Sequence, residues 1–214
     1  MKKTILIFTI LLVNLFATSQ VLYPKGCYMS FKEVLTKTPS EDHQLAIKKR
    51  TNLDIKMNGG NDYKLISANN TIKREFLKKK IFAYSTGDSL FINCLKYRLQ
   101  AWYSNVVSDG KYLVFTAGIP MDKDMQTKAM QEEIQLGMSF GVVVGAFSGA
   151  SLAMERYLYI LNKETNNIVL INNEVMNDVL KDFPDLLEQY NSENGKNEIS
   201  VRIEYLNLLN KKYE

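Results

Sequence analysis

Alternating hydrophobic and polar positions in the middle of the chain predict antiparallel β-strands joined by short turns. The clearest pair is 102–108 with 111–117, because Asp109-Gly110 between them is the strongest short hairpin signal in the sequence. The same alternation marks two further pairs and a single strand, which are 81–84 with 89–93, 156–161 with 168–172, and 62–67. In the loop of the last pair we expect an asparagine in the left-handed conformation.

Apolar residues spaced three and four apart predict helices near both ends of the chain. Ser30 and Glu33 form a capping box, so a short helix begins there and ends before Pro39. The tail carries two longer apolar stripes, at 176–190, where Pro184 predicts a kink or a restart, and at 199–213.

These elements together predict an α+β fold. A twisted antiparallel sheet of about three hairpins is covered by the helices. Residues 20–214 are numerous enough to bury one substantial core, and no internal repeat or low-complexity linker divides them. We therefore expect a single domain after an N-terminal signal.

Small residues recur at four-residue spacing within 134–154, a segment that carries no charge. Such a row on one helix face lets another backbone approach closely. Three interpretations stay open: a helix buried in the fold, a transmembrane helix about 31 Å long, or a self-association surface between two copies. The scarcity of leucine and isoleucine argues against a membrane span. The small residues are Gly137, Gly141, Gly145, Gly149 and Ala153.

The first nineteen residues are typical of a secretory signal peptide. Lys2 and Lys3 precede an apolar stretch, and Ala17-Thr18-Ser19 supplies the small residues of a cleavage site before Gln20. An uncleaved anchor is the alternative, while Cys27 is poorly placed for lipidation. We therefore expect export to the periplasm, the outer envelope or the extracellular space.

Net charge and cysteine content limit the possible partners and the possible covalent links. Removal of Lys2 and Lys3 with the signal lowers the formal net charge from +4 to +2, which gives no support for nucleic-acid binding. The two cysteines, Cys27 and Cys94, form either one disulfide or two buried thiols in an exported chain.

Two basic clusters stand out, and the second is a candidate for contact with anionic lipid headgroups or an acidic polysaccharide. They are Lys48-Lys49-Arg50 and residues 73–80, which end in Lys78, Lys79 and Lys80. The favoured interpretation of the second cluster is a solvated strand edge, because lysines deter edge-to-edge pairing.

Aromatic residues on the predicted strands form either an exposed sugar-binding row or, more commonly, part of the core. They are Tyr84, Tyr97, Trp102 and Tyr103.

The sequence offers little support for catalysis. His43 is the single histidine and stands in a polar stretch without the partners of a catalytic or metal site. Zinc-binding patterns and a phosphate-binding loop are absent from the sequence. We therefore expect that the protein is not an enzyme and binds no cofactor. We expect instead an exported structural or interaction protein of the cell envelope.

Two alternatives to this function remain. One is a membrane-associated or oligomer-forming protein that uses residues 134–154. The other is a hydrolase, which requires a pair of buried carboxylates that converge in a deep pocket. The partner is not specified by the sequence beyond self-association or membrane contact through 134–154.

Several short motifs resemble a family of uncharacterised secreted proteins from Bacteroidota-type bacteria. The N-terminal motif consists of Gly26, Tyr28, Ser30 and Glu33, and a C-terminal motif covers 180–187. The likeness spans about 26–40 and 156–214. It implies a secreted or envelope location, and it implies no activity.

Overall fold

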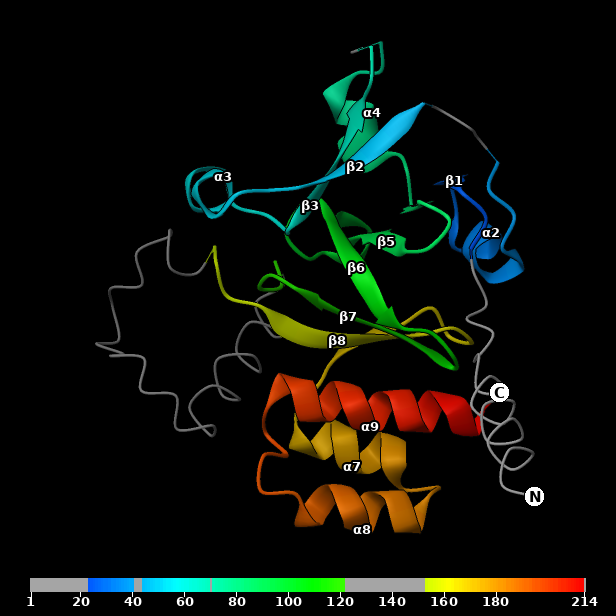
Figure 1. The fold of residues 1–214 in the computed structure, drawn as a ribbon, viewed down its shortest axis with the longest axis vertical. Helices are drawn as coiled ribbons and strands as arrows, with labels where there is room; N and C mark the ends of the chain where they lie inside the picture. Colours follow the sequence, from blue (N-terminus) through cyan, green and yellow to red (C-terminus); the bar gives the residue numbers. More distant parts are fainter. Residues whose placement is uncertain (1–22, 41–43, 70, 122–152, 214) are drawn as a thin grey trace, which may run out of the picture.

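A computed structural model of the chain describes residues 23–40, 44–69, 71–121 and 153–213. These residues form an α+β fold on one antiparallel sheet of nine strands (Figure 1). The strands are β1 (Gly26–Tyr28), β2 (Leu45–Lys49), β3 (Tyr63–Ser67), β4 (Ala83–Ser85), β5 (Leu90–Asn93), β6 (Tyr103–Ser108), β7 (Tyr112–Ala117), β8 (Tyr157–Asn162) and β9 (Ile168–Leu170). The helices are α2 (Phe31–Thr36), α3 (Asn52–Asn58), α4 (Arg74–Lys79), the 3-10 helix η2 (Cys94–Tyr97), α7 (Asn173–Leu180), α8 (Pro184–Ser192) and α9 (Ile199–Lys212).

The main path of the sheet follows the order β1-β4-β5-β6-β7-β8-β9. β2 and β3 form an additional hairpin, which joins the sheet where Tyr63 pairs with Tyr103 of β6. β6 pairs with β5 through its first half and with β7 through its second half. A register shift between Val106 and Ser108 lets the strand bend from one partner to the other.

All three predicted hairpins are present, as β4–β5, β6–β7 and β8–β9. Asn166 has φ 55° and occupies the left-handed position expected in the β8–β9 loop. The strand predicted at 62–67 is β3. β6 begins at Tyr103 because the φ of Trp102, 80°, lies outside the extended region.

The helix starts predicted near the N-terminus and the C-terminus of the chain are also confirmed. Ser30 Oγ accepts a hydrogen bond from the Glu33 backbone N–H at 3.3 Å, and the Glu33 carboxylate accepts one from the Met29 N–H at 2.8 Å. Both side chains of the predicted capping box are therefore hydrogen-bonded to the backbone at the start of α2. Pro184 is the first residue of α8, so the proline restarts the helix after α7 has ended.

The strand edge expected at 73–80 is wrong, because Arg74–Lys79 form helix α4. Leu77 is buried on this helix and Phe76 is half-buried, whereas Lys79 and Lys80 are exposed. Tyr97 was expected on a strand and lies in η2 instead. β1, β2 and α3 were not among the predicted elements.

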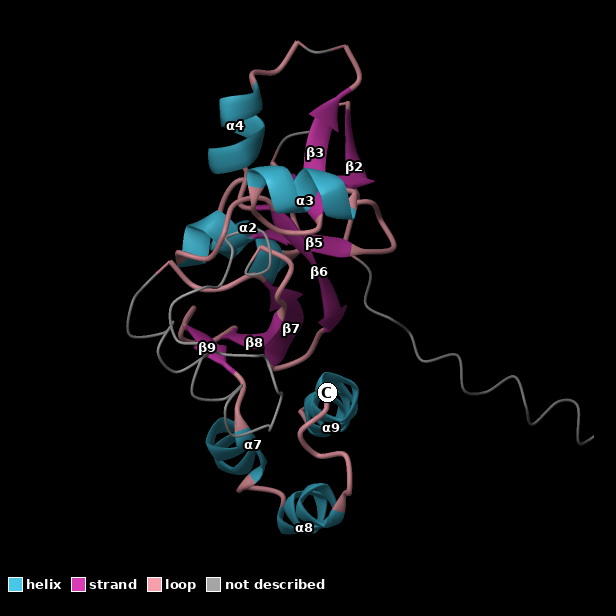
Figure 2. Cartoon of the chain, turned by 90° about the vertical axis from the view of Figure 1, so that its left-hand side faces the viewer, coloured by secondary structure: helices cyan, strands magenta, loops and turns pink. Residues whose placement is uncertain are grey.

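Three groups of buried side chains join the layers. α7 and α9 cover one face of β7 and β8, and α8 packs against these two helices on the side away from the sheet (Figure 2). Val114 and Leu158 contribute the strand side of this core. On the opposite face, Phe115 and Tyr159 pack in a core that includes Val34 of α2. α4 and the β2–β3 hairpin enclose the third group around Trp102.

Much of the apolar glycine-rich segment lies outside the described residues, as do the signal segment 1–19 and His43. This applies to Gly137, Gly141, Gly145 and Gly149. Ala153, the last member of the row, is described and is 5% exposed. Within the described ranges, no helix combines the length and apolar character needed to cross a bilayer.

Candidate functional site

A buried guanidinium, that of Arg50, holds α3 to the start of β3. It donates hydrogen bonds to the carbonyl oxygens of Gly59 at 2.7 Å and Asn61 at 2.9 Å. Its Nε lies 3.0 Å from a carboxylate oxygen of Asp54, in the first turn of α3. The hydrogen bond from the Arg50 guanidinium holds the pKa of the Asp54 carboxyl well below its ordinary value. The buried charge of Arg50 is therefore matched by close acceptors.

A second set of polar contacts joins the same loop to β7 and β8. Asn61 accepts a hydrogen bond from the Gly118 N–H at 2.7 Å, just beyond β7. Arg156, just before β8, forms an ion pair with Asp62 at 2.6 Å and donates to the Ala153 carbonyl at 3.0 Å. Because these contacts are made within the domain, we assign them a structural role.

Polar contacts also hold Met121 and Ala153, the described residues on either side of 122–152. Met121 is bonded through its N–H to the Arg98 carbonyl, and Ala153 is held by Arg156. β7 and β8, on either side of the segment, pair along six residue positions. The two paired strands therefore lie on the same side of any membrane.

An exposed surface of mixed aliphatic and cationic character lies on the outer side of the β2–β3 hairpin and on α3. Ala46 pairs with Ile66 and Lys48 pairs with Lys64, and residues that pair directly share one face of a hairpin. Lys64 also lies 3.4 Å from Asp54 of α3, so the hairpin and the helix are adjacent. We call this surface the outer face. It consists of Ala46, Lys48, Lys64 and Ile66 on the hairpin and Leu53, Lys56 and Met57 on α3.

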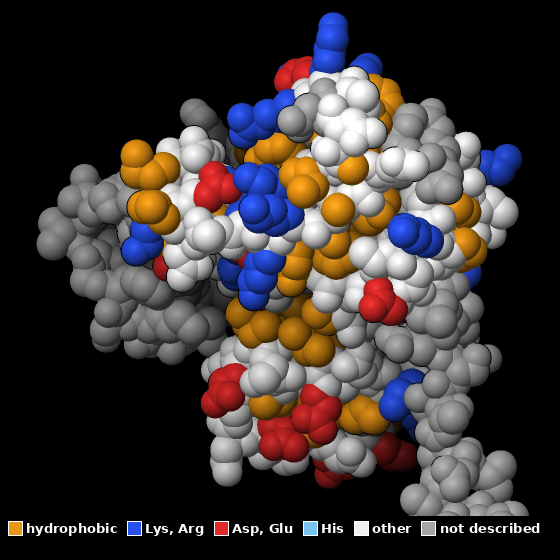
Figure 3. All heavy atoms as spheres, turned by 45° about the horizontal axis from the view of Figure 1, so that its top comes forward, with side chains coloured by type: hydrophobic (Ala, Val, Ile, Leu, Met, Phe, Trp, Pro, Cys, Tyr) orange, Lys and Arg blue, Asp and Glu red, His pale blue; other side chains and the backbone are white. Residues whose placement is uncertain are grey.

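The molecule is divided by charge. Residues 44–105 contain twelve Lys and Arg and four Asp and Glu, a formal net charge of +8. Residues 173–213 contain five Lys and Arg and eight Asp and Glu, a net charge of −3. In Figure 3, Lys and Arg side chains gather over the upper elements and acidic side chains over the lower helices. The two ends of the domain therefore favour partners of opposite charge.

The cations of α4 have contacts within their own domain. The Arg74 guanidinium lies 5.4 Å from the centre of the Trp102 ring, and Lys78 Nζ lies 5.9 Å from it. Lys79 forms an ion pair with Glu75, and Lys80 is exposed at the end of the helix. Of the predicted trio, Lys78 therefore helps to cover Trp102, Lys79 is ion-paired, and Lys80 is exposed.

The aromatic residues favour the core over a sugar-binding row. Tyr84, Trp102 and Tyr103 are buried. Tyr97 is half-buried, its hydroxyl donates to Asn166 at 2.7 Å, and burial raises the pKa of that hydroxyl. The expectation of core packing is confirmed for the three buried rings.

Cys27 and Cys94 are two buried thiols and are not joined in a disulfide. Cys27 packs in the group around Trp102, whereas Cys94 belongs to the core that includes α2. Cys94 Sγ lies 3.1 Å from the Ser104 hydroxyl, and burial raises the pKa of its thiol to about 12. The second of the two interpretations of these cysteines therefore holds, and the Cys94 thiol stays protonated at neutral pH.

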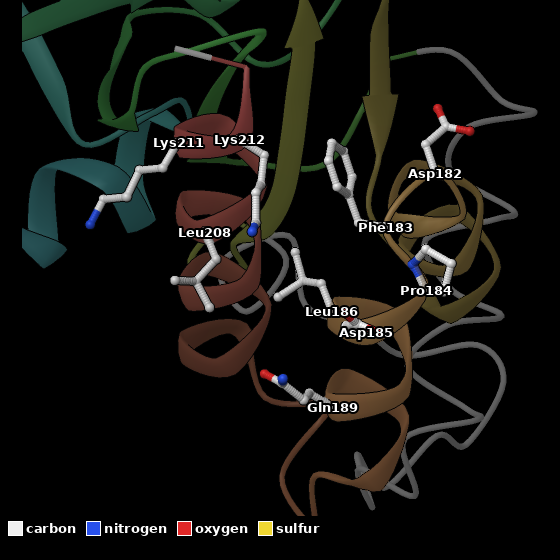
Figure 4. Close-up of a pocket in the computed structure, with 9 residues that line it drawn as sticks. All are labelled: Asp182, Phe183, Pro184, Asp185, Leu186, Gln189, Leu208, Lys211 and Lys212. Carbon is white, nitrogen blue, oxygen red and sulfur yellow. The ribbon is translucent and has the colours of Figure 1, made fainter.

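A groove of about 600 Å³ lies between α8 and α9. Leu186 points from α8 toward α9, while Lys211 extends away from the groove (Figure 4). Asp182 and Asp185, its carboxylates, are exposed. They therefore do not supply the buried carboxylate pair that the hydrolase hypothesis requires. The lining consists of Asp182, Phe183, Pro184, Asp185, Leu186, Gln189, Leu208, Lys211 and Lys212.

The described parts of the chain contain no group of three or more His, Cys, Asp and Glu side chains arranged to hold a metal ion. The outer face had one signal in the sequence, the run Lys48-Lys49-Arg50. Leu53 and Met57 had none, because they stand in a short helix that the pattern did not predict.

Comparison with known proteins shows which family the chain belongs to but assigns it no activity. No curated protein and no solved structure matches it. One family model, described as a family of unknown function (DUF6563), matches residues 26–213. The expected relationship to an uncharacterised family is confirmed, while the bacterial origin and the secretion that the resemblance implies stay predictions. The chain belongs to this family of unknown function.

Proposed function

We propose that the protein is an exported interaction module of the cell envelope, which works without catalysis and binds an anionic partner through its outer face. The observation that carries the proposal is that Lys48 and Lys64 stand opposite each other on the β2–β3 hairpin, while the adjacent helix α3 adds the exposed Lys56. The candidate signal peptide supports export.

The pairing of two lysines strengthens this proposal. Lys48 and Lys64 stand directly opposite each other on β2 and β3, an arrangement that destabilises a hairpin. Asp54 offsets part of the repulsion from the side of Lys64, whereas Lys48 is exposed. An anionic partner would relieve the remaining repulsion, which gives the pair a favourable role in binding.

Self-association through residues 134–154 remains a second candidate. The pairing of Ala117 with Tyr157 supports it, because the chain leaves the sheet before the segment and returns to the sheet after it at neighbouring positions. The glycine row would then supply a close-packing surface between two copies. This candidate is compatible with binding through the outer face.

A charge-neutralised variant tests the main proposal. Lys48→Gln/Lys56→Gln/Lys64→Gln should bind soluble heparin about 100-fold more weakly than the parent at low ionic strength, since each lysine near an anionic surface contributes about 1 kcal/mol. Isothermal titration calorimetry measures the affinity. The matched control is Lys181→Gln/Lys211→Gln/Lys212→Gln, which removes the same charge from the helical layer. Equal weakening in both triple variants would show that net charge alone governs binding, and the proposal would fail.

A further inference from the structure

α3 exposes its large apolar side chains to solvent. Leu53 is 71% exposed and Met57 is 76% exposed, the highest values among the large hydrophobic residues of the described part of the chain. They are four residues apart, so they lie on the same side of the helix. Ile55 is the buried residue of α3. The two exposed side chains therefore add little to the packing of the helix on its own domain.

Polar contacts hold this helix in place. The Thr51 hydroxyl accepts from the Asp54 N–H at 3.1 Å at the N-terminus of α3, and Arg50 binds the Asp54 carboxylate. The Gly59 N–H donates to the Ile55 carbonyl at 2.7 Å at the other end. α3 is thus fixed by hydrogen bonds at both ends while its outer side presents aliphatic groups.

Cations accompany these aliphatic groups. Lys56 is exposed and stands three residues after Leu53, so it is a neighbour of Leu53 on the helix surface. Lys64 of the adjacent hairpin reaches Asp54, and Lys48 stands beside it on the outer face. Aliphatic side chains that protrude among lysines match the two layers of a bilayer surface, since the acyl boundary accepts the first and anionic headgroups attract the second.

We propose that the outer face docks on an anionic lipid bilayer, with Leu53 and Met57 entering the headgroup boundary and Lys48, Lys56 and Lys64 contacting lipid phosphates. This inference rests on the proposed function and names its partner. A soluble polyanion would engage the lysines without using the two aliphatic side chains. The contribution of Leu53 and Met57 to the binding affinity therefore distinguishes a bilayer from other anionic partners.

Vesicle co-sedimentation tests the docking. The variant Leu53→Ser/Met57→Ser should bind vesicles of phosphatidylcholine and phosphatidylglycerol about tenfold more weakly or worse, because each aliphatic side chain that leaves water favours binding. Its affinity for soluble heparin should stay equal to that of the parent. The matched control is Val169→Ser/Leu208→Ser, which changes two side chains that are each 38% exposed elsewhere on the molecule.

The outcomes distinguish the two proposals. Parent-like vesicle binding by Leu53→Ser/Met57→Ser, or no binding of parent protein to these vesicles, would overturn the docking and leave heparin binding through the lysines intact. Parent-like heparin binding by the lysine variant would overturn the proposed function itself. Unchanged thermal midpoints in both serine variants, measured by circular dichroism, ensure that a loss of vesicle binding reports the surface and not unfolding.

Discussion

Replacing Asn210 with leucine is expected to lower the free energy of unfolding by about 3 kcal/mol, because several buried polar groups would lose their hydrogen-bond partner. The Asn210 side chain accepts from the Tyr112 N–H at 3.0 Å and donates to the Tyr112 carbonyl at 2.9 Å. It also donates to the Ser108 hydroxyl at 2.8 Å. An amide from α9 thus takes the place of a strand partner where β6 and β7 approach their turn.

The turn itself is shaped around this amide. A Cβ atom added at Gly110 would lie 2.4 Å from Asn210 Cβ, so the glycine of the hairpin signal is required for close approach to α9. Asn210 therefore couples the helical layer to the sheet.

Urea unfolding followed by circular dichroism measures the loss. The matched control is Asn207→Leu, which makes the same change at a half-buried position of the same helix and should alter the midpoint little. Equal midpoints for Asn210→Leu and the parent would contradict the assigned role of this amide.

Replacing Arg50 with methionine is expected to cost about 3 to 5 kcal/mol of stability, the usual effect of removing one partner from a buried charged network. The carbonyl oxygens of Gly59 and Asn61 would lose their donor. Asp54 would lose its principal cation, and α3 would lose a main contact with the domain.

The neighbouring residue supplies the control. Lys49→Met removes a cation from an exposed position of β2 and should leave stability nearly unchanged. Hydrogen exchange should also show faster exchange of the amides of α3 in Arg50→Met than in the parent. Slow exchange in α3 together with an unchanged urea midpoint would refute the anchoring role of Arg50.

The Arg50→Met variant bears on function through the position of α3. The outer face requires the helix to lie beside the β2–β3 hairpin, and Arg50 fixes that placement through Asp54. Loss of Arg50 should therefore disturb the surface without removing any of its exposed side chains.

The hairpins and the helix ends were predictable because local residues determine them. Asp109-Gly110 favours a tight turn wherever it stands, and Asn166 tolerates the left-handed conformation. Ser30 and Glu33 satisfy the N-terminal donors of α2 within four residues. Pro184 begins a helix more easily than it continues one.

The missed helices depend on contacts from distant parts of the chain. Leu53 and Met57 face solvent on α3, so the helix lacks the apolar stripe that sequence periodicity detects. On α4, Arg74 and Lys78 are positioned by the ring of Trp102, which lies more than twenty residues away in the sequence. A run of basic residues gives no local sign of such a partner.

The candidate site was visible in the sequence only as a run of charge. Lys48 lies on the outer face, Lys49 lies on the other side of β2, and Arg50 is buried. Strand alternation separates the first two, but the burial of Arg50 depends on the loop at Asn61. The contact between Asp62 and Arg156, 94 residues apart, likewise has no local signal.

A fluorophore at position 57 tests the docking of the outer face most directly. Met57→Cys offers an exposed thiol for an environment-sensitive dye, whereas Cys27 and Cys94 are fully buried. On addition of anionic vesicles, we predict a shift of the emission to shorter wavelength for this protein and no shift for the same dye at Leu208→Cys. An unchanged emission at position 57 on vesicles that bind the protein, or a shift at position 208 instead, would contradict it.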